Sequence, residues 1–278
     1  MDRRWRWLGR RWWVRWWRLR WLRWRRRVQR RRSRRKILML DAVERVVSPF
    51  LTAADAALGG GYSAVLYGSA ARDDYVPGRS DVNLILVVED LSPAALRALG
   101  SAFAGWRKSK LEPPLVITRA EWDRATDSFP VEIADMRTGY EVLRGADPLR
   151  QLEVAPTDLR QALEREFRGK LLRLRQGYAA SAGDPAALGA LAGRSAGTMM
   201  VLLRGLLTLL GRAVPKDPLQ LAVAGAEALG VDSEPLLLVV RHRGDANWRC
   251  PPESFEPYMD VAARAARFLD QLQLGDRS

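Results

Sequence analysis

The chain has 278 residues, enough for one large domain or two of ordinary size, and its 47% hydrophobic residues can build a sizeable core. It contains one cysteine, Cys250, and one histidine, His242, which excludes an intramolecular disulfide, a cysteine-rich zinc site and a metal site built from several histidines. A single free cysteine fits a reducing compartment, so we expect a cytoplasmic protein.

The formal net charge of +14 is concentrated at the N-terminus. Residues 1–36 contain 18 of the 46 lysines and arginines but only one acid, Asp2, so the remainder has 28 basic and 31 acidic residues and a net charge of −3. An argument for a nucleic acid or an anionic membrane as partner therefore applies to this segment alone.

The same segment holds 8 of the 11 tryptophans. It suits an interfacial helix on an anionic membrane, or an arm that grips nucleic acid by charge and stacking. Its tryptophans fall on both sides of a helix, which weakens the membrane interpretation, and it has no uncharged apolar run typical of a signal peptide. Because Met39 offers a second start, we predict that residues 1–38 are an extension that is disordered or not native.

Residues 39–150 predict a unit of mixed α and β structure. Apolar residues at helical spacing indicate a helix over 40–58, in which Pro49 could introduce a kink. A helix capped by Ser92 runs to about residue 108, and a short one covers 119–126. Four runs rich in apolar and branched residues predict strands at 63–67, 81–89, 114–118 and 130–136.

Residues 151–278 predict a helical bundle, which makes the expected fold class α+β. The apolar run at 199–211 is too short to span a bilayer and contains Arg204, so we place it in the core. The expected helices begin with a long one capped by Thr157, and the others cover 185–193, 196–211, 217–229 and 254–273.

The stretch "YGSAARDDYVPGRSDVNLILVV", residues 67–88, carries the most specific chemical pattern. Gly68 permits close approach of a phosphate to the backbone and Ser69 can donate a hydrogen bond to it. Asp81 and Asn83, spaced i and i+2 on a strand, point to one face. Two carboxylates in this spacing, with a third from a neighbouring strand, hold two Mg²⁺ ions about 4 Å apart and can catalyse nucleotidyl transfer.

This stretch resembles the DNA polymerase beta-like nucleotidyltransferase superfamily in the order of its features. An apolar strand is followed by Gly-Ser, a gap of 11 residues, and then Asp-x-Asp/Asn on a second strand. Over residues 40–278 the chain looks most like bacterial proteins of the aminoglycoside-nucleotidyltransferase type. The segment "FPVEIADMR" and the following "VLRGADPL" are similar to the place where such proteins carry the third acid. The resemblance implies that Gly68 and Ser69 bind the triphosphate of ATP or another NTP, that Asp81 ligates Mg²⁺, and that the third acid lies on the 130–136 strand.

Two acids compete for that third position. Glu132 and Asp135 are three residues apart and would face opposite ways on a regular strand, which favours the more central Glu132 but leaves Asp135 open. Arg72 and Lys170 have two interpretations each. Arg72 reaches phosphate or is a solvated loop charge, and Lys170 touches phosphate or lies on a solvated helix face. His242 is expected at the surface and not in the site.

Asn83 departs from the pattern because an amide offers one neutral oxygen and cannot bridge two cations. Such a loss commonly costs on the order of 10²–10⁴ in rate, although an amide can still ligate one hard cation. The sequence therefore leaves open whether the enzyme is active or has become degenerate.

The leading hypothesis is Mg²⁺-dependent transfer of a nucleoside monophosphate, AMP in most such proteins, from NTP to a hydroxyl of a small-molecule or protein acceptor. Glu132 or a metal-bound water would take the proton, and the acidic body suits a cationic acceptor. One alternative is a nucleotide-binding or interaction protein without turnover. Another is an antitoxin-like nucleotidyltransferase, although its own helices lack the Arg-x₄₋₆-His pair of the RNase usually paired with such a protein.

Overall fold

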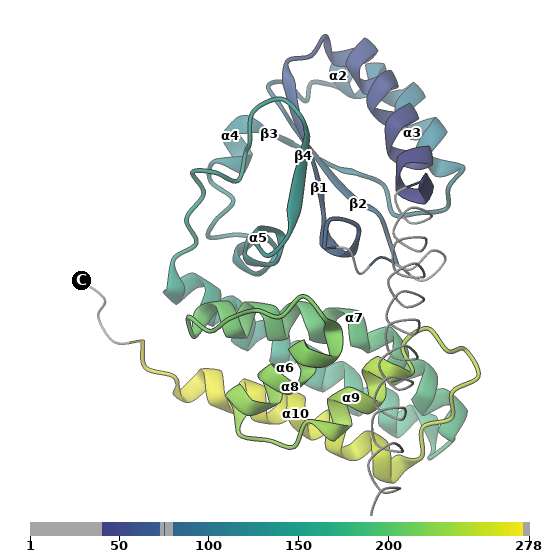
Figure 1. Ribbon diagram of the computed structural model, residues 1–278, viewed down its shortest axis with the longest axis vertical. Coiled ribbons are helices and arrows are strands. Elements are labelled where there is room, and N and C mark those ends of the chain that lie inside the picture. The colour runs from purple at the N-terminus through teal and green to yellow at the C-terminus, as the bar shows by residue number, and fades with distance from the viewer. Residues whose placement is uncertain (1–40, 73–74, 76–79, 275–278) are drawn as a thin grey trace, which may run out of the picture.

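The computed structural model describes residues 41–72, 75 and 80–274, so the predictions on residues 1–38 lie outside it. Within this range the chain has a sheet part, residues 41–150, and a helical part, residues 156–274 (Figure 1). The predicted α+β class, a mixed sheet followed by a helical bundle, is confirmed. The expectation of separate domains at 39–150 and 151–278 stays a prediction.

The sheet part contains four strands in the order β3-β2-β1-β4. The central strand β1 pairs antiparallel with β2 and with β4, and β2 pairs parallel with β3. The last residue of β1, Tyr67, lies opposite Asn83 of β2 and Tyr140 of β4. The end of β1 and the starts of β2 and β4 therefore share one end of the sheet, which faces the helical part (Figure 1). The strands are β1 (Tyr62–Tyr67), β2 (Asn83–Val88), β3 (Leu115–Thr118) and β4 (Tyr140–Arg144).

Helices cover both faces of this sheet. On one face, residues 41–58 form a helix that continues through Pro49, and α3 (Gly100–Arg107) packs beside it. The predicted single helix up to residue 108 is divided into α2 (Pro93–Ala98) and α3. On the other face lie α4 (Arg119–Trp122) and α5 (Pro130–Arg137), which bury Trp122, Ile133 and Met136 against the strands. Burial on both sides explains the continuous apolar sequence of β2.

The prediction of a strand at 130–136 is wrong, because these residues form helix α5. Pro130 occupies the first helical position, where its fixed φ favours a helix and its missing N–H costs nothing. Ile133 and Met136, three residues apart, then fall on one helical face against the sheet. The fourth strand is β4, which follows through Gly139.

The helical part surrounds the long helix α7, which packs on α6, α8, α9 and α10. The prediction of two helices at 185–193 and 196–211 is wrong, since α7 is continuous through Ser195, and α9 was not expected from the sequence. The elements are α6 (Pro156–Ser181), α7 (Pro185–Leu209), α8 (Pro218–Leu229), α9 (Glu234–Arg241) and α10 (Pro252–Gln271).

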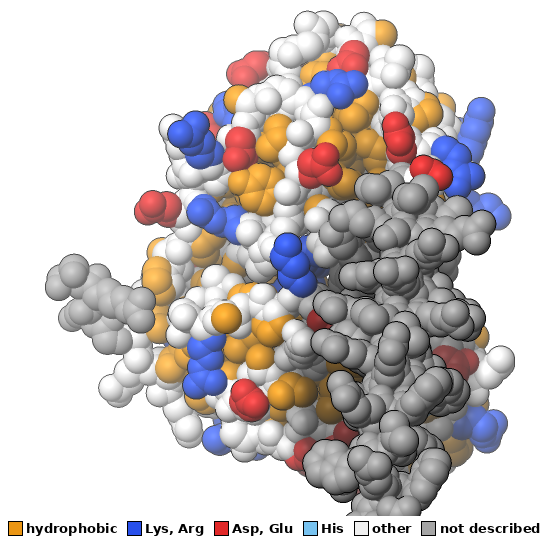
Figure 2. All heavy atoms as spheres, in the orientation of Figure 1, with side chains coloured by type: hydrophobic (Ala, Val, Ile, Leu, Met, Phe, Trp, Pro, Cys, Tyr) orange, Lys and Arg blue, Asp and Glu red, His pale blue; other side chains and the backbone are white. Residues whose placement is uncertain are grey.

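Among the residues that the structure describes, only α7 is long and apolar enough to cross a membrane. Its leucines at 202, 203, 206 and 207 are buried among the neighbouring helices, as expected for a core helix. Acidic and basic side chains alternate over the face shown in Figure 2, consistent with the small net charge of the sequence after residue 36.

Alanine substitutions at two glycines of α7 would measure how tightly this core is packed. A Cβ at Gly189 would clash with the backbone carbonyl oxygen of Trp248, whereas one at Gly193 would meet nothing within 4 Å. We expect Gly189→Ala to lower the free energy of unfolding by about 2–3 kcal/mol, because backbone must move. Gly193→Ala should raise it by up to about 1 kcal/mol, because alanine favours a helix. Urea denaturation followed by circular dichroism measures both, and equal effects would contradict the close packing.

Candidate functional site

The Gly68 turn and the start of β2 meet directly. Gly68 has φ 76°, a conformation that favours glycine, and its carbonyl accepts hydrogen bonds from the amides of Ala71 and Arg72 at 3.2 and 3.1 Å. A Cβ at this position would lie 2.6 Å from Nδ2 of Asn83. The backbone conformation therefore favours glycine here, and the side chain of Asn83 lies against the turn.

Ser69 and Asp81 are the other two polar residues predicted for this end of the sheet. Ser69 is half-buried in the short 3₁₀ turn Gly68–Ala70, and its hydroxyl has no hydrogen-bond partner in the described part of the chain. Asp81 is exposed, two residues before β2 begins. Burial, and then the charge of Asp81, raises the pKa of Tyr75, which places the carboxylate near this buried ring.

Asp135 lies in a buried cluster with two arginines. Its Oδ2 accepts from Nη1 of Arg72 at 3.4 Å, and its Oδ1 accepts from Nε of Arg204. The three side chains are 6–10% exposed. Nη1 of Arg72 also donates to Oγ1 of Thr138 at 3.3 Å, and Gly139 leaves room for the arginine because a Cβ there would clash with Cγ of Arg72.

This cluster corrects the solvated-loop interpretation of Arg72, because the side chain is buried and ion-paired. The sequence missed Arg204, which it assigned only to the core. A single arginine within the apolar run of α7 was the available signal, since a buried charge requires a partner. That partner comes from α5, which is 69 residues away in the sequence.

Glu132 and Asp135 do not face opposite ways, because they lie on a helix and not on a strand. Residues three apart are neighbours on a helix surface. Burial raises the pKa of Tyr67 most, followed by the charges of Asp135 and then of Glu132, so both carboxylates lie near the end of β1. Glu132 is exposed and forms no ion pair within the described residues, whereas Asp135 is buried and paired.

The donors present do not fit a two-metal centre. The described residues contain no cluster of three or more Asp, Glu, His or Cys side chains that could hold a metal. The positions of β3 that pair with the Asn83 face of β2 are Leu115 and Ile117, so no acid projects from the neighbouring strand. One carboxylate and one amide oxygen, Asp81 and Asn83, do fit a single hard cation whose other ligands come from phosphates and water.

Lys170 and His242 lie away from the Gly68 turn. Lys170 is buried between α6 and α7, where Nζ donates to the carbonyl oxygen of Ser195 at 3.0 Å, so neither the phosphate nor the solvated-face interpretation describes it. Burial, with a smaller contribution from Arg173, lowers the pKa of Lys170 to about 8. His242 is half-buried at the end of α9 and stacks on Trp248, with ring centroids 4.8 Å apart.

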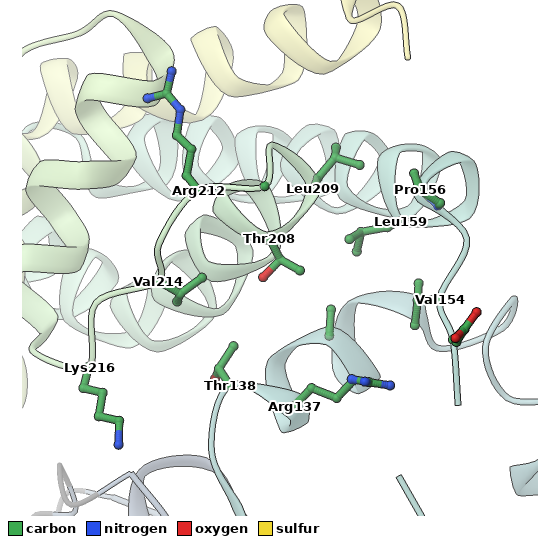
Figure 3. Close-up of a pocket in the computed structure, with 13 residues that line it drawn as sticks. Arg137, Thr138, Val154, Pro156, Leu159, Thr208, Leu209, Arg212, Val214 and Lys216 are labelled. Atoms are coloured by element: carbon green, nitrogen blue, oxygen red, sulfur yellow. The ribbon is translucent and has the colours of Figure 1, made fainter. Parts of the chain in front are cut away.

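A cavity of about 650 Å³ lies where the sheet part meets the helical part. It is bounded by the end of α5, the start of α6, and the loop that follows α7 (Figure 3). Thr138 forms part of its wall and also contacts Arg72, so the cavity adjoins the buried cluster. A cleft between the sheet part and the helical part was expected from the sequence, but the residues that line it, which range from Ala134 to Lys216, are brought together only by the tertiary structure.

No protein-family model matches the chain, and no curated protein matches it. One solved structure that it resembles is the crystal structure of spectinomycin adenyltransferase AAD(9) from Enterococcus faecialis with ATP and spectinomycin. The two sequences are 13% identical, the alignment covers 83% of this chain and 98% of that chain, and the TM-score is 0.48. A likeness at this level carries no inference about substrates or residues, so we derive the function from this chain's own side chains.

The substitution Asp135→Asn should destabilise the protein strongly. It removes the carboxylate that compensates two buried guanidinium groups, and breaking a buried ion pair from one side costs about 3–5 kcal/mol. Glu132→Gln, on the same helix but exposed, should change the free energy of unfolding by less than about 0.5 kcal/mol. Chemical denaturation of both variants measures the difference, and a similar small loss in both would show that the cluster does not stabilise the fold.

Lys170 should make stability depend on alkaline pH. Its folded-state pKa, about 8, lies below the usual lysine value of 10.5, so the cost of burying its charge is fully present below pH 8 and is relieved as pH rises toward 10.5. Lys170→Met should therefore be the more stable protein at pH 7, and its advantage should shrink between pH 8 and 10. Paired urea titrations at several pH values measure this difference, and a pH-independent gap would contradict the assignment.

Proposed function

We propose that this chain binds a nucleoside triphosphate at the Gly68 turn and slowly transfers its nucleoside monophosphate, AMP when the nucleotide is ATP, to an acceptor hydroxyl. The observation that carries the proposal is the contact between Gly68 and Asn83, which brings a phosphate-binding type of turn against the polar start of β2. The resemblance of residues 63–89 to nucleotidyltransferases supports the same chemistry.

Each residue of this end of the sheet has a distinct task in the proposal. Gly68 lets the phosphates approach the backbone amides, and the hydroxyl of Ser69 donates to a phosphate oxygen. Asp81 and Asn83 would hold one Mg²⁺, which would neutralise phosphate charge when bound. Arg72 acts indirectly, because its guanidinium group is buried against Asp135 and so ties the end of the turn to α5.

Glu132 is the proposed acceptor of the proton from the attacking hydroxyl. It is exposed, has no ion-pair partner in the described residues, and lies near the end of β1. Asp135 is unsuited to that task because its side chain is buried and both of its oxygens are already bonded to arginines. Slow transfer is expected, because the reduced cation site stabilises less charge in the transition state than three carboxylates would.

Nucleotide binding without transfer is a second candidate, favoured by the ion pairing of Asp135. If Asp135 corresponds to the third acid of the nucleotidyltransferases that the chain resembles, its carboxylate is already paired with Arg72 and Arg204 and cannot ligate a cation. The cation site would then lack two carboxylate ligands, this one and the one that Asn83 replaces. Such a protein would bind ATP and release no pyrophosphate.

Asn83→Asp is expected to raise Mg²⁺-dependent pyrophosphate release by about 10² or more, because it restores a carboxylate beside Asp81. The matched control is Asn247→Asp, which makes the same chemical change on the exposed loop after α9 and should leave the rate unchanged. The assay follows pyrophosphate from ATP across candidate acceptors, with ATP binding measured in parallel by calorimetry.

The results of these assays distinguish three cases: nucleotidyl transfer, nucleotide binding without transfer, and neither activity. ATP binding with no pyrophosphate release from parent or Asn83→Asp would favour binding without transfer. Gly68→Val should abolish ATP binding in either case, because a side chain there clashes with Asn83 and strains φ. Absence of ATP binding by the parent protein would sink the proposal.

A further inference from the structure

The cavity between the sheet part and the helical part has an apolar centre and a basic rim. Its centre is lined by Val154, Leu159, Leu209 and Val214, with the hydroxyl of Thr208 among them (Figure 3). The carbonyl oxygen of Thr208 accepts from the amide of Gly211 at 3.0 Å, whereas its side-chain hydroxyl has no hydrogen-bond partner in the described part of the chain. The volume of about 650 Å³ lies within the range of pockets that take small organic ligands.

Three basic residues and one acid line this cavity, and without Arg212, which is directed away from it, they leave an excess of one positive charge. Arg137 and Lys216 extend along the side nearest the sheet part, while the guanidinium group of Arg212 points away (Figure 3). Arg137 donates to the carbonyl oxygens of Leu149 and Leu152, which hold its guanidinium group in place without neutralising it. The acid is Glu153, and no ion pair joins it to a basic residue in the described residues.

The cavity is separate from the Gly68 turn. Arg72 and Thr138 stand between them, and the hydroxyl of Thr138 is already engaged, because it donates to the carbonyl oxygen of Asp135 at 2.7 Å and accepts from Arg72. A ligand in the cavity would therefore meet the apolar centre and the two cations at its rim, and would not contact Ser69 or Asn83.

We propose that this cavity binds a small organic anion, a carboxylate or a phosphate monoester on an apolar body. The body packs on Val154, Leu159 and Val214, and the charged group lies at the rim against Lys216. The local charge disfavours a cationic ligand here, although the chain after residue 36 is slightly acidic overall. This inference does not depend on nucleotidyl transfer.

The test uses the full chain and 4-phenylbutyrate, with 4-phenylbutan-1-ol and 4-phenylbutylamine as neutral and cationic probes of the same body. Calorimetry or ligand-observed NMR should show the carboxylate binding at least about tenfold more tightly than either analogue. Phenyl phosphate measured in parallel identifies the preferred anionic group. Preferential binding of either anion supports the proposal.

Two variants locate the binding. Lys216→Glu reverses an exposed charge at the rim and should weaken phenylbutyrate binding about tenfold, whereas Lys108→Glu, exposed beside α3, should not change it. Val214→Trp fills the cavity and should abolish binding of the probe. Equal binding of the three probes, no binding of either anion, an equal effect of both lysine variants, or displacement of phenylbutyrate by ATP would each overturn the proposal.

Discussion

One carboxylate shared by two buried guanidinium groups holds the candidate site together. Asp135 comes from a helix on the sheet, Arg72 from the loop after the Gly68 turn, and Arg204 from the central helix of the helical part. Removing three charges from water is costly, and only mutual pairing offsets that cost. The cluster therefore fixes how the turn and α5 lie against the helical part, and the cavity forms beside it because Thr138 belongs to both.

The same pairing limits the chemistry. A carboxylate whose two oxygens both accept from arginines has few lone pairs left for a cation or a proton. With an amide at Asn83 and apolar residues on β3, the negative charge available at this end of the sheet comes from Asp81 and from the exposed Glu132. The proposed nucleotide site therefore lacks, among the described residues, ligands for two metal ions, which favours weak transfer or binding without transfer over fast catalysis.

The charge around the cavity differs from the net charge of the chain. The high isoelectric point comes from residues 1–36, the rest of the chain is slightly acidic, and the cavity between the two parts is nevertheless basic. A cavity responds to the few charges at its rim, since charges in solvent beyond about 10 Å are screened at ordinary ionic strength. Net charge thus gave no guide to the ligand that the cavity favours.

Local sequence determined much of this protein. The apolar runs predicted β1, β2 and β3, and helical periodicity predicted α6, α8 and α10, although the predicted cap at Thr157 is wrong because α6 already begins at Pro156. Glycine at position 68 predicted a tight turn after a strand. These features depend on neighbours within a few residues. The tertiary structure alone decided that 130–136 is a helix, that Asp135 pairs with Arg204 and that a basic cavity lies between the two parts. Each of these depends on which distant surfaces meet, because a short apolar segment fits a strand or a helix equally well and a buried charge can be placed only once its partner is known.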